Sequence, residues 1–461
     1  MVQTIVIVFI LYLIGMLLIS WRGKAHSSSF SEYLTIDGKA PLILLIGGAV
    51  GAQVGNGLVV GGAGSGAAVG IAGIAYGLSC ALSYLVLFVF TKTIRKNECL
   101  TPPEYLQKQY KSKAIAQILN LLYAISTLPS IAAQMLAAKV LFDALGMNGY
   151  VGLIALMVVV FIYSQISGLW GAYATSVVQT AVILAGILAA AGYIVATGGI
   201  AEITGAVASG ALPGTFLSAE GYDVSTWLLY MMPGILCAAI DNVSWQRINS
   251  ASSLEAAKKH FWISSLVMVP VVFAPVLIGM YGRAHFGFAD NTAFFGVVLN
   301  IFPPVLAALV VVAVVAAVMS TIDGMMIAQS VTLLRGFYKN VLDPEASDEK
   351  LNKLTLPCNI LTLCGAAVFA FSTNSILGLL ANTYLFSSAV CLAPVICGWF
   401  WKGTTRKGAV AAMIVGFTVA ILQMFGIYSL PYSGITHVIP SFVTIFIVSL
   451  LTKEGTKTAE V

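Results

Sequence analysis

Long apolar segments, separated by short polar ones, follow one another along the chain. Within a segment the apolar residues do not alternate with polar ones at a period of two, so helices are predicted rather than the strands of a β-barrel. Many segments are close to the roughly 20 residues that cross a bilayer as a helix. Thirteen helices are predicted, at 3–21, 41–68, 70–91, 114–143, 151–166, 171–198, 225–246, 261–284, 304–334, 354–373, 376–401, 409–427 and 435–452.

Composition supports the same class of protein. Apolar residues make up 59% of the 461 residues, charged residues only 9%, and the mean hydropathy is +0.95. Soluble proteins carry about 25% charged residues, so this composition argues against a soluble enzyme, a nucleic-acid-binding protein or a disordered scaffold. We expect one all-α polytopic membrane domain over 1–461. The first segment lacks a basic leader and a cleavage site, so it is predicted to be a retained span.

Basic residues gather in alternate loops. Together the loops on one side hold 21 of the 23 Lys and Arg residues, and the exceptions are Lys139 and Arg283 near the other face. Lys139 is expected to pair with Asp143, four residues later. The positive-inside rule then places the N-terminus outside and the C-terminus in the cytoplasm of a cell membrane. The basic loops are 22–40, 92–113, 247–260, 335–353, 402–408 and 453–461.

The predicted spans divide into two units of opposite topology. Without the first helix (3–21) and two peripheral helices (409–452), five spans lie in 41–198 and five in 225–401. The first unit begins inside and the second begins outside. Two inverted five-helix units are the pattern of many secondary transporters.

The second span is unusually rich in glycine, with the sequence GGAVGAQVGNGLVVGGAGSGAA at 47–68. Glycine costs about 1 kcal/mol against alanine inside a helix, although small residues also allow close helix packing. Packing does not explain Gln53 and Asn56, whose amides at mid-span need partners or a water-lined cavity. Unwinding near 51–57 would free carbonyls to bind a cation. The more specific interpretation, beside helix packing, is therefore a discontinuous helix that lines a solute and ion site.

Adjacent hydroxyls and two acids mark other spans. Ser320 and Thr321 lie side by side, with Ala317 one turn earlier, and their oxygens with free carbonyls suit a small alkali cation. The hydroxyls are also explained as hydrogen-bonding contacts between helices. Asp323 and Asp241 lie deepest in apolar segments and are functional candidates; for Asp241 a structural ion pair or hydrogen bond, with Arg247 nearby, is the alternative.

Motifs of soluble chemistry are missing from the sequence. It contains no Walker loop, no HExxH and no GxSxG, which argues against an ATP-driven pump and against an enzyme. The seven cysteines form no CxxC pair, and we interpret them as small buried hydrophobic residues. We expect no organic cofactor and no nucleic-acid partner.

Four segments together resemble the sodium:solute symporter family, which includes proline and sodium/sugar cotransporters. They are the glycine-rich second span, GLWGAYATSVVQ at 168–179, DNVSWQRINSAS at 241–252 and VMSTID at 318–323. The resemblance implies a sodium-coupled, alternating-access symporter with a five-plus-five, LeuT-like core. It further implies one sodium site between the second and ninth spans, with carbonyl oxygens from Gly51, Val54 and Ala317 and hydroxyls from Ser320 and Thr321.

One residue departs from the family pattern. Ser176 stands where the family usually has an acid on the sixth span, close to the sodium ions. Its absence removes a negative charge, so we expect one sodium ion per cycle. Asp323 could partly replace the missing charge.

The solute is expected to bind at mid-membrane between the second, third, fourth and seventh spans. Gln53, Asn56 and Gly57 are the candidate contacts, with Tyr76 and Met232 as possible wall residues. Since the resemblance places no aromatic residue at the cage positions, a quaternary ammonium is not supported, and an amino acid, a carboxylate or a vitamin remains open. The expected partners are a small polar organic solute, sodium and the lipid bilayer. Proton coupling through Asp241 or Asp323, and less so a passive channel, are the alternatives.

Overall fold

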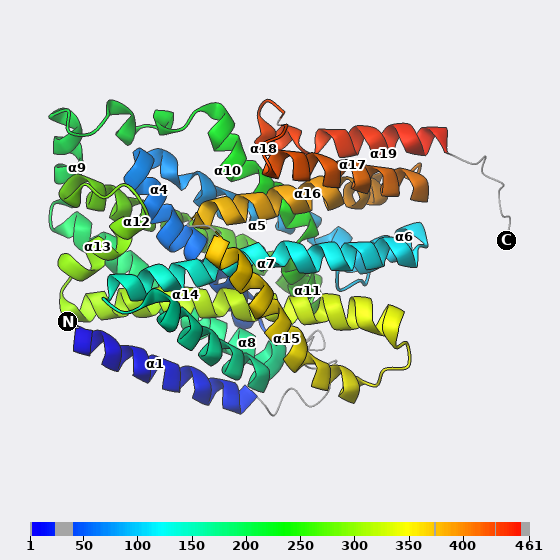
Figure 1. The fold of residues 1–461 in the computed structure, drawn as a ribbon, viewed down its shortest axis with the longest axis horizontal. Helices are drawn as coiled ribbons and strands as arrows, with labels where there is room; N and C mark the ends of the chain where they lie inside the picture. Colours follow the sequence, from blue (N-terminus) through cyan, green and yellow to red (C-terminus); the bar gives the residue numbers. More distant parts are fainter. Residues whose placement is uncertain (1, 24–39, 373–374, 429, 453–461) are drawn as a thin grey trace.

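The computed structural model describes residues 2–23, 40–372, 375–428 and 430–452 (Figure 1). In these ranges the chain is helical throughout and forms no strand, apart from one isolated bridge between Ala40 and Ala251. The helices run mostly along one direction, and α1 (Val2–Gly23) begins at the opposite end of the bundle from the end of α19 (Ile439–Leu451) (Figure 1). The prediction of an all-α membrane protein is therefore confirmed.

The remaining longer elements follow in chain order. The first half contains α3 (Leu42–Gln53), η2 (Gly57–Gly61), α4 (Gly62–Val69), η3 (Gly70–Ile74), α5 (Ala75–Lys96), α6 (Pro102–Tyr110), α7 (Lys113–Ala144), α8 (Gly149–Ala196) and α9 (Gly199–Ala208). The second half contains α10 (Val224–Cys237), η6 (Ala238–Ile240), α11 (Asn242–Ser250), α12 (Leu254–Phe286), α13 (Thr292–Asn300), α14 (Pro304–Ser330), η7 (Val331–Leu342), α15 (Asp348–Ser372), α16 (Ile376–Phe400), α17 (Arg406–Met424) and α18 (Ser433–Thr436).

The number of spans differs from the thirteen predicted. Among the described residues, ten helices are long and apolar enough to cross a membrane, or up to eleven if the bent pair α10–α11 is one span. The predicted spans 41–68 and 70–91 run together over Gly57–Lys96, and Gly149–Ile162, at the place of the predicted 151–166, is too short to count. That segment and the span Ala172–Ala196 belong to the single helix α8. Its 48 residues would extend about 72 Å if straight, more than two bilayer cores. The count of thirteen is not confirmed.

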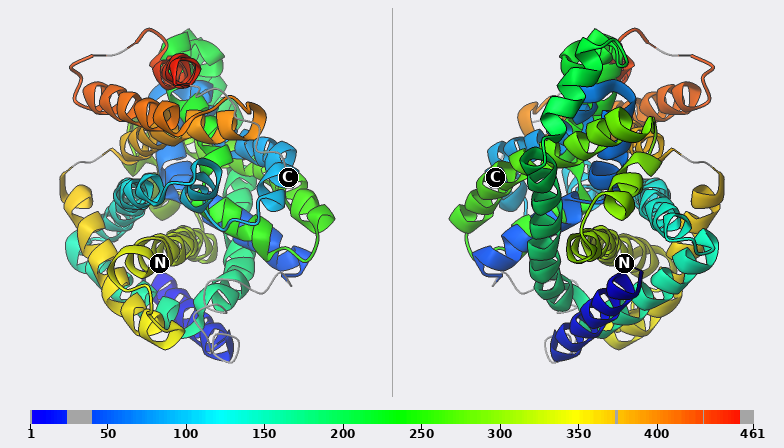
Figure 2. Two further views of the ribbon diagram at one scale, coloured as in Figure 1. Left: turned by 90° about the vertical axis from the view of Figure 1, so that its right-hand side faces the viewer. Right: turned by 90° about the vertical axis from the view of Figure 1, so that its left-hand side faces the viewer.

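One helix forms the centre of the bundle. α14 packs against α8, α1, α7 and α3, and nearly all of its side chains from Ala307 to Ser330 are buried. Around it lie α12 against α5 and α4, and α16 against α17 and α10 (Figure 2). The polar groups discussed below therefore lie in the interior, where they must find partners within the protein.

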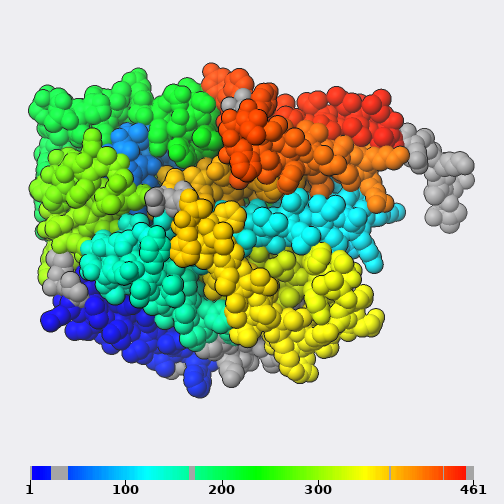
Figure 3. Space-filling model, viewed as in Figure 1, coloured from blue at the N-terminus to red at the C-terminus, as the bar shows by residue number. Residues whose placement is uncertain are grey.

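The outermost helices carry large apolar residues on their exposed sides. Leu11 on α1 is 64% exposed, Leu361 on α15 is 72% exposed and Leu451 at the end of α19 is 80% exposed. In Figure 3, α1, α15 and the pair α17–α19 cover the outside of the face in view. Such surfaces are rare on soluble monomers, and they are compatible with the outside of a multi-pass membrane protein.

Candidate functional site

The glycine-rich second span is interrupted, as predicted. α3 ends at Gln53, Val54 leaves helical geometry with ψ at 59°, and helix resumes as a π-helical turn at Gly57. The Asn56 amide N–H, freed by the interruption, donates to Oε1 of Gln134 on α7 at 2.8 Å. The Asn56 side chain donates to the Val314 carbonyl on α14 at 3.4 Å. The break at 54–56 thus lies within the predicted 51–57 and is held by side-chain contacts.

The paired hydroxyls of α14 lie against this interruption. Thr321 Oγ1 donates to the Ala52 carbonyl in the last turn of α3 at 3.2 Å. A Cβ placed at Gly51 would lie 2.6 Å from Ser320 Oγ, so α3 and α14 approach each other closely there. Gly51, Ser320 and Thr321 are buried, and Ala52 is partly buried. Hydroxyl and carbonyl oxygens therefore converge between two helices.

A third helix contributes hydroxyls to the same place. Ser176 Oγ on α8 lies 3.3 Å from Ser320 Oγ, and Thr180 Oγ1 donates to the Gly47 carbonyl at 2.8 Å. The five residues predicted to bind sodium are buried on facing segments of α3 and α14; they are Gly51, Val54, Ala317, Ser320 and Thr321. The neutral oxygen set is the kind that binds a hard cation.

A second helix is broken on the other side of the site. α10 and η6 end at Ile240, and α11 follows Asp241 at an angle of 45°. The Ile240 carbonyl accepts from the Tyr123 hydroxyl of α7 at 2.7 Å. Asp241 Oδ2 accepts from the Ser244 amide at 2.8 Å and so caps α11. Of the two alternatives left open for Asp241, the structure favours the hydrogen bond, since the carboxylate makes no ion pair with Arg247 within 4.0 Å.

A cavity of about 140 Å³ lies between the two breaks. Its walls come from α3, η2, α5, α7, α10, α11, α14 and α16. Gln53, Gly57 and Tyr76 are on its wall, as the sequence predicts for solute contacts, whereas Asn56 and Met232 are not. Asn56 instead supports the interruption through Gln134 and Val314.

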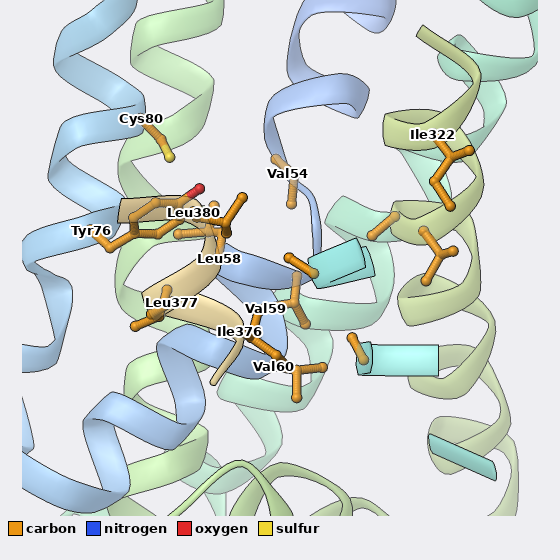
Figure 4. Packing of buried hydrophobic residues seen from close by; sticks show 14 of the residues in the cluster. Val54, Leu58, Val59, Val60, Tyr76, Cys80, Ile322, Ile376, Leu377 and Leu380 are labelled. Atoms are coloured by element: carbon orange, nitrogen blue, oxygen red, sulfur yellow. The ribbon is translucent and has the colours of Figure 1, made fainter. Parts of the chain in front are cut away.

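One end of the cavity is closed by apolar side chains. Leu380 of α16 packs on Gly57 beside the Tyr76 ring, and Tyr76 stacks on Tyr384 with ring centres 6.5 Å apart. In Figure 4, Tyr76, Leu380 and Leu58 converge at this point. From there the wall extends along α5 to Leu87, toward the basic end of that helix.

Asp323 and the Lys139–Asp143 pair lie in different surroundings. Asp323 is 1% exposed, and neither of its oxygens has a hydrogen-bond partner among the described residues. Ser164 on α8 is the polar side chain that faces it. The predicted Lys139–Asp143 pair is confirmed, with Nζ to Oδ2 at 2.9 Å, and Asp143 Oδ1 also accepts from the Gly149 amide at 2.8 Å.

Several important residues escaped the sequence analysis. Gln134 and Tyr123 hold the two breaks, and Tyr384 stacks on Tyr76 at the closed end of the cavity. Gln134 could have been found by the argument used for Gln53, because both are uncharged amides in the middle of an apolar span. Tyr123 and Tyr384 carry no comparable signal, since tyrosines are common in such spans.

An interrupted helix, a hydroxyl pair against the interruption and an internal polar cavity define a membrane transport protein. Residues 44–416 match the sodium:solute symporter family, and the chain belongs to this family. The chain is a multi-pass membrane protein of this family, and the predicted resemblance is confirmed.

Relatives of known function are distant and diverse. The chain is 27% identical over 419 residues to sodium/myo-inositol cotransporter 2 of Sus scrofa, with 81% of this chain and 62% of that protein covered. It is 27% identical over 383 residues to the high-affinity proline transporter of Bacillus subtilis (strain 168), covering 79% of each. It is 23% identical over 373 residues to the sodium/pantothenate symporter of Escherichia coli (strain K12), covering 76% and 74%. The chain thus spans less than two thirds of the inositol cotransporter.

Solved structures share the fold. A Na⁺-coupled sialic acid symporter, in a substrate-bound outward-open state, matches with a TM-score of 0.84 at 16% identity, covering 98% of both chains. A transporter of the nucleobase-cation-symport-1 family, in a closed conformation with bromovinylhydantoin bound, matches with a TM-score of 0.56 at 13% identity, covering 90% of this chain and 94% of the other. The predicted LeuT-like fold class is confirmed.

Proposed function

We propose that this protein is a sodium-coupled symporter that imports a small polar organic solute by alternating access. The observation that carries the proposal is the contact of Thr321 Oγ1 with the Ala52 carbonyl, where a hydroxyl-bearing helix meets an interrupted one. Family membership supports sodium coupling. The three relatives named above are specific for different solutes, so they do not fix the solute of this chain.

Sodium is proposed to bind where α3 and α14 meet. Carbonyls of Gly51, Val54 and Ala317 and the hydroxyls of Ser320 and Thr321 would hold it, while α8 supplies Ser176 beside Ser320. Because Ser176 is neutral, the proposed site holds one ion. The proximity of these groups, buried between two helices, supports this assignment.

The proposed cycle couples ion and solute through the two broken helices. Sodium would bridge α3 to α14 and stabilise the outward-open state, which orders the adjacent cavity for the solute. A ligand shifts a conformational equilibrium only through its different affinity for the two states, and a bridging ion has that property. A charge that crosses the membrane gains about 2.3 kcal/mol per 100 mV, so an inside-negative potential would assist uptake.

The breaks also suit the proposed pair of inverted units. α3 and α10 are the first helices of the units 41–198 and 225–401, and each is interrupted in its apolar stretch. Interrupted segments in corresponding positions of two halves point to the transport site. With the N-terminus outside and the C-terminus in the cytoplasm of the cell membrane, as the basic loops predict, the cavity extends toward the cytoplasmic half.

The function is tested in two steps. A thermal-shift screen of amino acids, monocarboxylates, sugars and vitamins, with and without sodium, selects a solute, and its uptake is then measured in proteoliposomes. We expect an imposed sodium gradient to drive uptake and saturation with solute concentration. Uptake driven by a pH gradient but not by sodium would identify the proton-coupled alternative, and a large conductance that does not saturate would identify a channel.

A further inference from the structure

The cavity wall contains one acid and one base among the described residues. The acid is Asp241, at the break between η6 and α11, and the base is Arg247 on α11. The rest of the wall is built from hydroxyls, amides, thiols, aromatic rings and aliphatic groups. A solute in this cavity therefore meets one acidic side chain, Asp241, and one basic side chain, Arg247.

The Asp241 carboxylate has unused binding capacity. Its Oδ2 caps α11 through the Ser244 amide at 2.8 Å, and this is the only hydrogen bond that the carboxylate makes within the described part of the chain. No Lys, Arg or His nitrogen in the described ranges lies within 4.0 Å of it. A carboxylate in a membrane interior is costly to keep charged without a counter-charge.

Three tyrosines line the same cavity as this carboxylate, namely Tyr84, Tyr123 and Tyr384. Tyr123 donates its own hydroxyl to the Ile240 carbonyl, and Tyr84 donates to the Ala49 carbonyl. Both hydroxyls are used within the protein, so neither donates to Asp241, and aromatic rings in a cavity wall are compatible with a bound cation.

Arg247 lines the same cavity but makes no ion pair with Asp241 within 4.0 Å. Its guanidinium is 6.0 Å from the centre of the Tyr173 ring and packs beside Gly48 and Gly324. This side chain is 6% exposed, and its Nε has no hydrogen-bond partner. It occupies the gap between α3 and α14, next to the small cavity below Ser320.

We propose that Asp241 binds the protonated amine of the transported solute, so that the substrate class is a small organic ammonium compound. This assignment rests on the proposed function and specifies the solute of the same cavity. The amine would meet Oδ1 and the surrounding rings, and in an α-amino acid the carboxylate would extend toward Arg247. A primary or secondary ammonium donates hydrogen bonds to a carboxylate, which sets it apart from the quaternary ammonium compounds that the sequence analysis disfavoured.

The chemistry of Asp241 allows a clean test. Asparagine caps a helix about as well as aspartate, so Asp241→Asn removes the charge and keeps the cap, whereas Asp241→Ala removes both. Asp223→Asn is the matched control, because Asp223 caps α10 in the same way through the Thr226 amide at 2.8 Å but lies outside the cavity wall. The purified full-length chain is screened by thermal shift, in sodium, against amino acids, their decarboxylated amines, their deaminated acids and neutral polyols.

We expect wild type and Asp223→Asn to be stabilised by amine-bearing compounds, and Asp241→Asn to bind the same compounds at least tenfold more weakly. Stabilisation of wild type by acids or polyols alone, or by no amine at all, would overturn the assignment. Equal amine affinity in Asp241→Asn would do the same. If Asp241→Asn does not fold, the wild-type panel still decides.

A sodium titration without solute separates this proposal from the proposed function. If sodium stabilises wild type and drives uptake of a neutral solute, sodium symport stands and the ammonium assignment fails. If sodium has no effect on stability or uptake while amines bind, the ammonium assignment stands and sodium symport fails. The sodium response of Asp241→Asn is expected to equal that of wild type.

Discussion

Thr321 Oγ1 donates a hydrogen bond to the carbonyl of Ala52, a residue 269 positions earlier in the chain, at 3.2 Å. The contact joins the central helix α14 to the last turn of α3, immediately before the helix is interrupted. A sodium ion placed between these segments would compete for the same oxygens. The hydrogen bond therefore marks the surface along which α3 and α14 would separate or close in a transport cycle.

Removal of either α14 hydroxyl is expected to weaken sodium binding without unfolding the protein. Thr321→Ala and Ser320→Ala should each raise the sodium concentration for half-maximal uptake by about tenfold, or about 1.4 kcal/mol, since each removes one of few oxygen ligands. Thr321→Ser keeps a hydroxyl and should stay near wild type. Sodium-dependent uptake in proteoliposomes measures the effect, and unchanged sodium dependence in both alanine variants would argue against these ligands.

Gln134 is expected to matter for stability because it accepts from the Asn56 amide freed by the break. Gln134→Leu leaves that buried N–H without an acceptor, which should lower the free energy of unfolding by about 1–3 kcal/mol. Gln117 on the same helix has no partner for either side-chain atom among the described residues, so Gln117→Leu should be neutral or stabilising. Thermal unfolding in detergent compares the two; an equal loss in both variants would contradict the role of Gln134.

Sequence reasoning located the interruption because its signal is local. Gln53 and Asn56 are polar in an apolar span, and the glycines around them lower the cost of unwinding, so composition alone marks the place. The hydroxyl pair of α14 was found in the same way. Gln134 was missed as a partner because it lies 78 residues from Asn56, and nothing in one sequence pairs two distant amides.

Asp241 shows what spacing leaves open. Its nearness to Arg247 in sequence allowed an ion pair or a hydrogen bond, but six helical residues rotate two side chains to about 120° apart. The spacing of three to Ser244 is instead that of a helix cap, which the structure contains. The span count differed for another reason: the predicted spans 41–68 and 70–91 run together over Gly57–Lys96, and Gly149–Ile162, at the place of the predicted 151–166, is too short to count as a span.

Tyr123 is expected to stabilise the second break through its hydroxyl. In Tyr123→Phe the Ile240 carbonyl loses a donor at 2.7 Å, which should lower the free energy of unfolding by about 0.5–1.5 kcal/mol and slow uptake. Tyr150→Phe, on a side chain that is 48% exposed, is the control and should resemble wild type in both assays. Full activity and full stability in Tyr123→Phe would show that the carbonyl at the bend does not need this partner.

Two glycines of one stretch are expected to respond oppositely to the same added methyl group. A Cβ at Gly55 would lie 2.9 Å from Thr321 Oγ1 and 3.0 Å from Gln134 Nε2, closer than side chains normally approach, whereas the nearest atom to a Cβ at Gly62 is 3.8 Å away. Gly55→Ala must therefore displace Thr321 or Gln134, and the sodium requirement should rise about tenfold or more, with a loss of stability. Gly62→Ala lies within a helix and should stabilise by up to about 1 kcal/mol, because alanine favours helix over glycine. Uptake at graded sodium concentrations and thermal unfolding of the two variants measure both effects. A Gly55→Ala variant with normal sodium dependence would mean that the ion binds away from the junction of α3 and α14, since no methyl group fits there without moving a proposed ligand or its support.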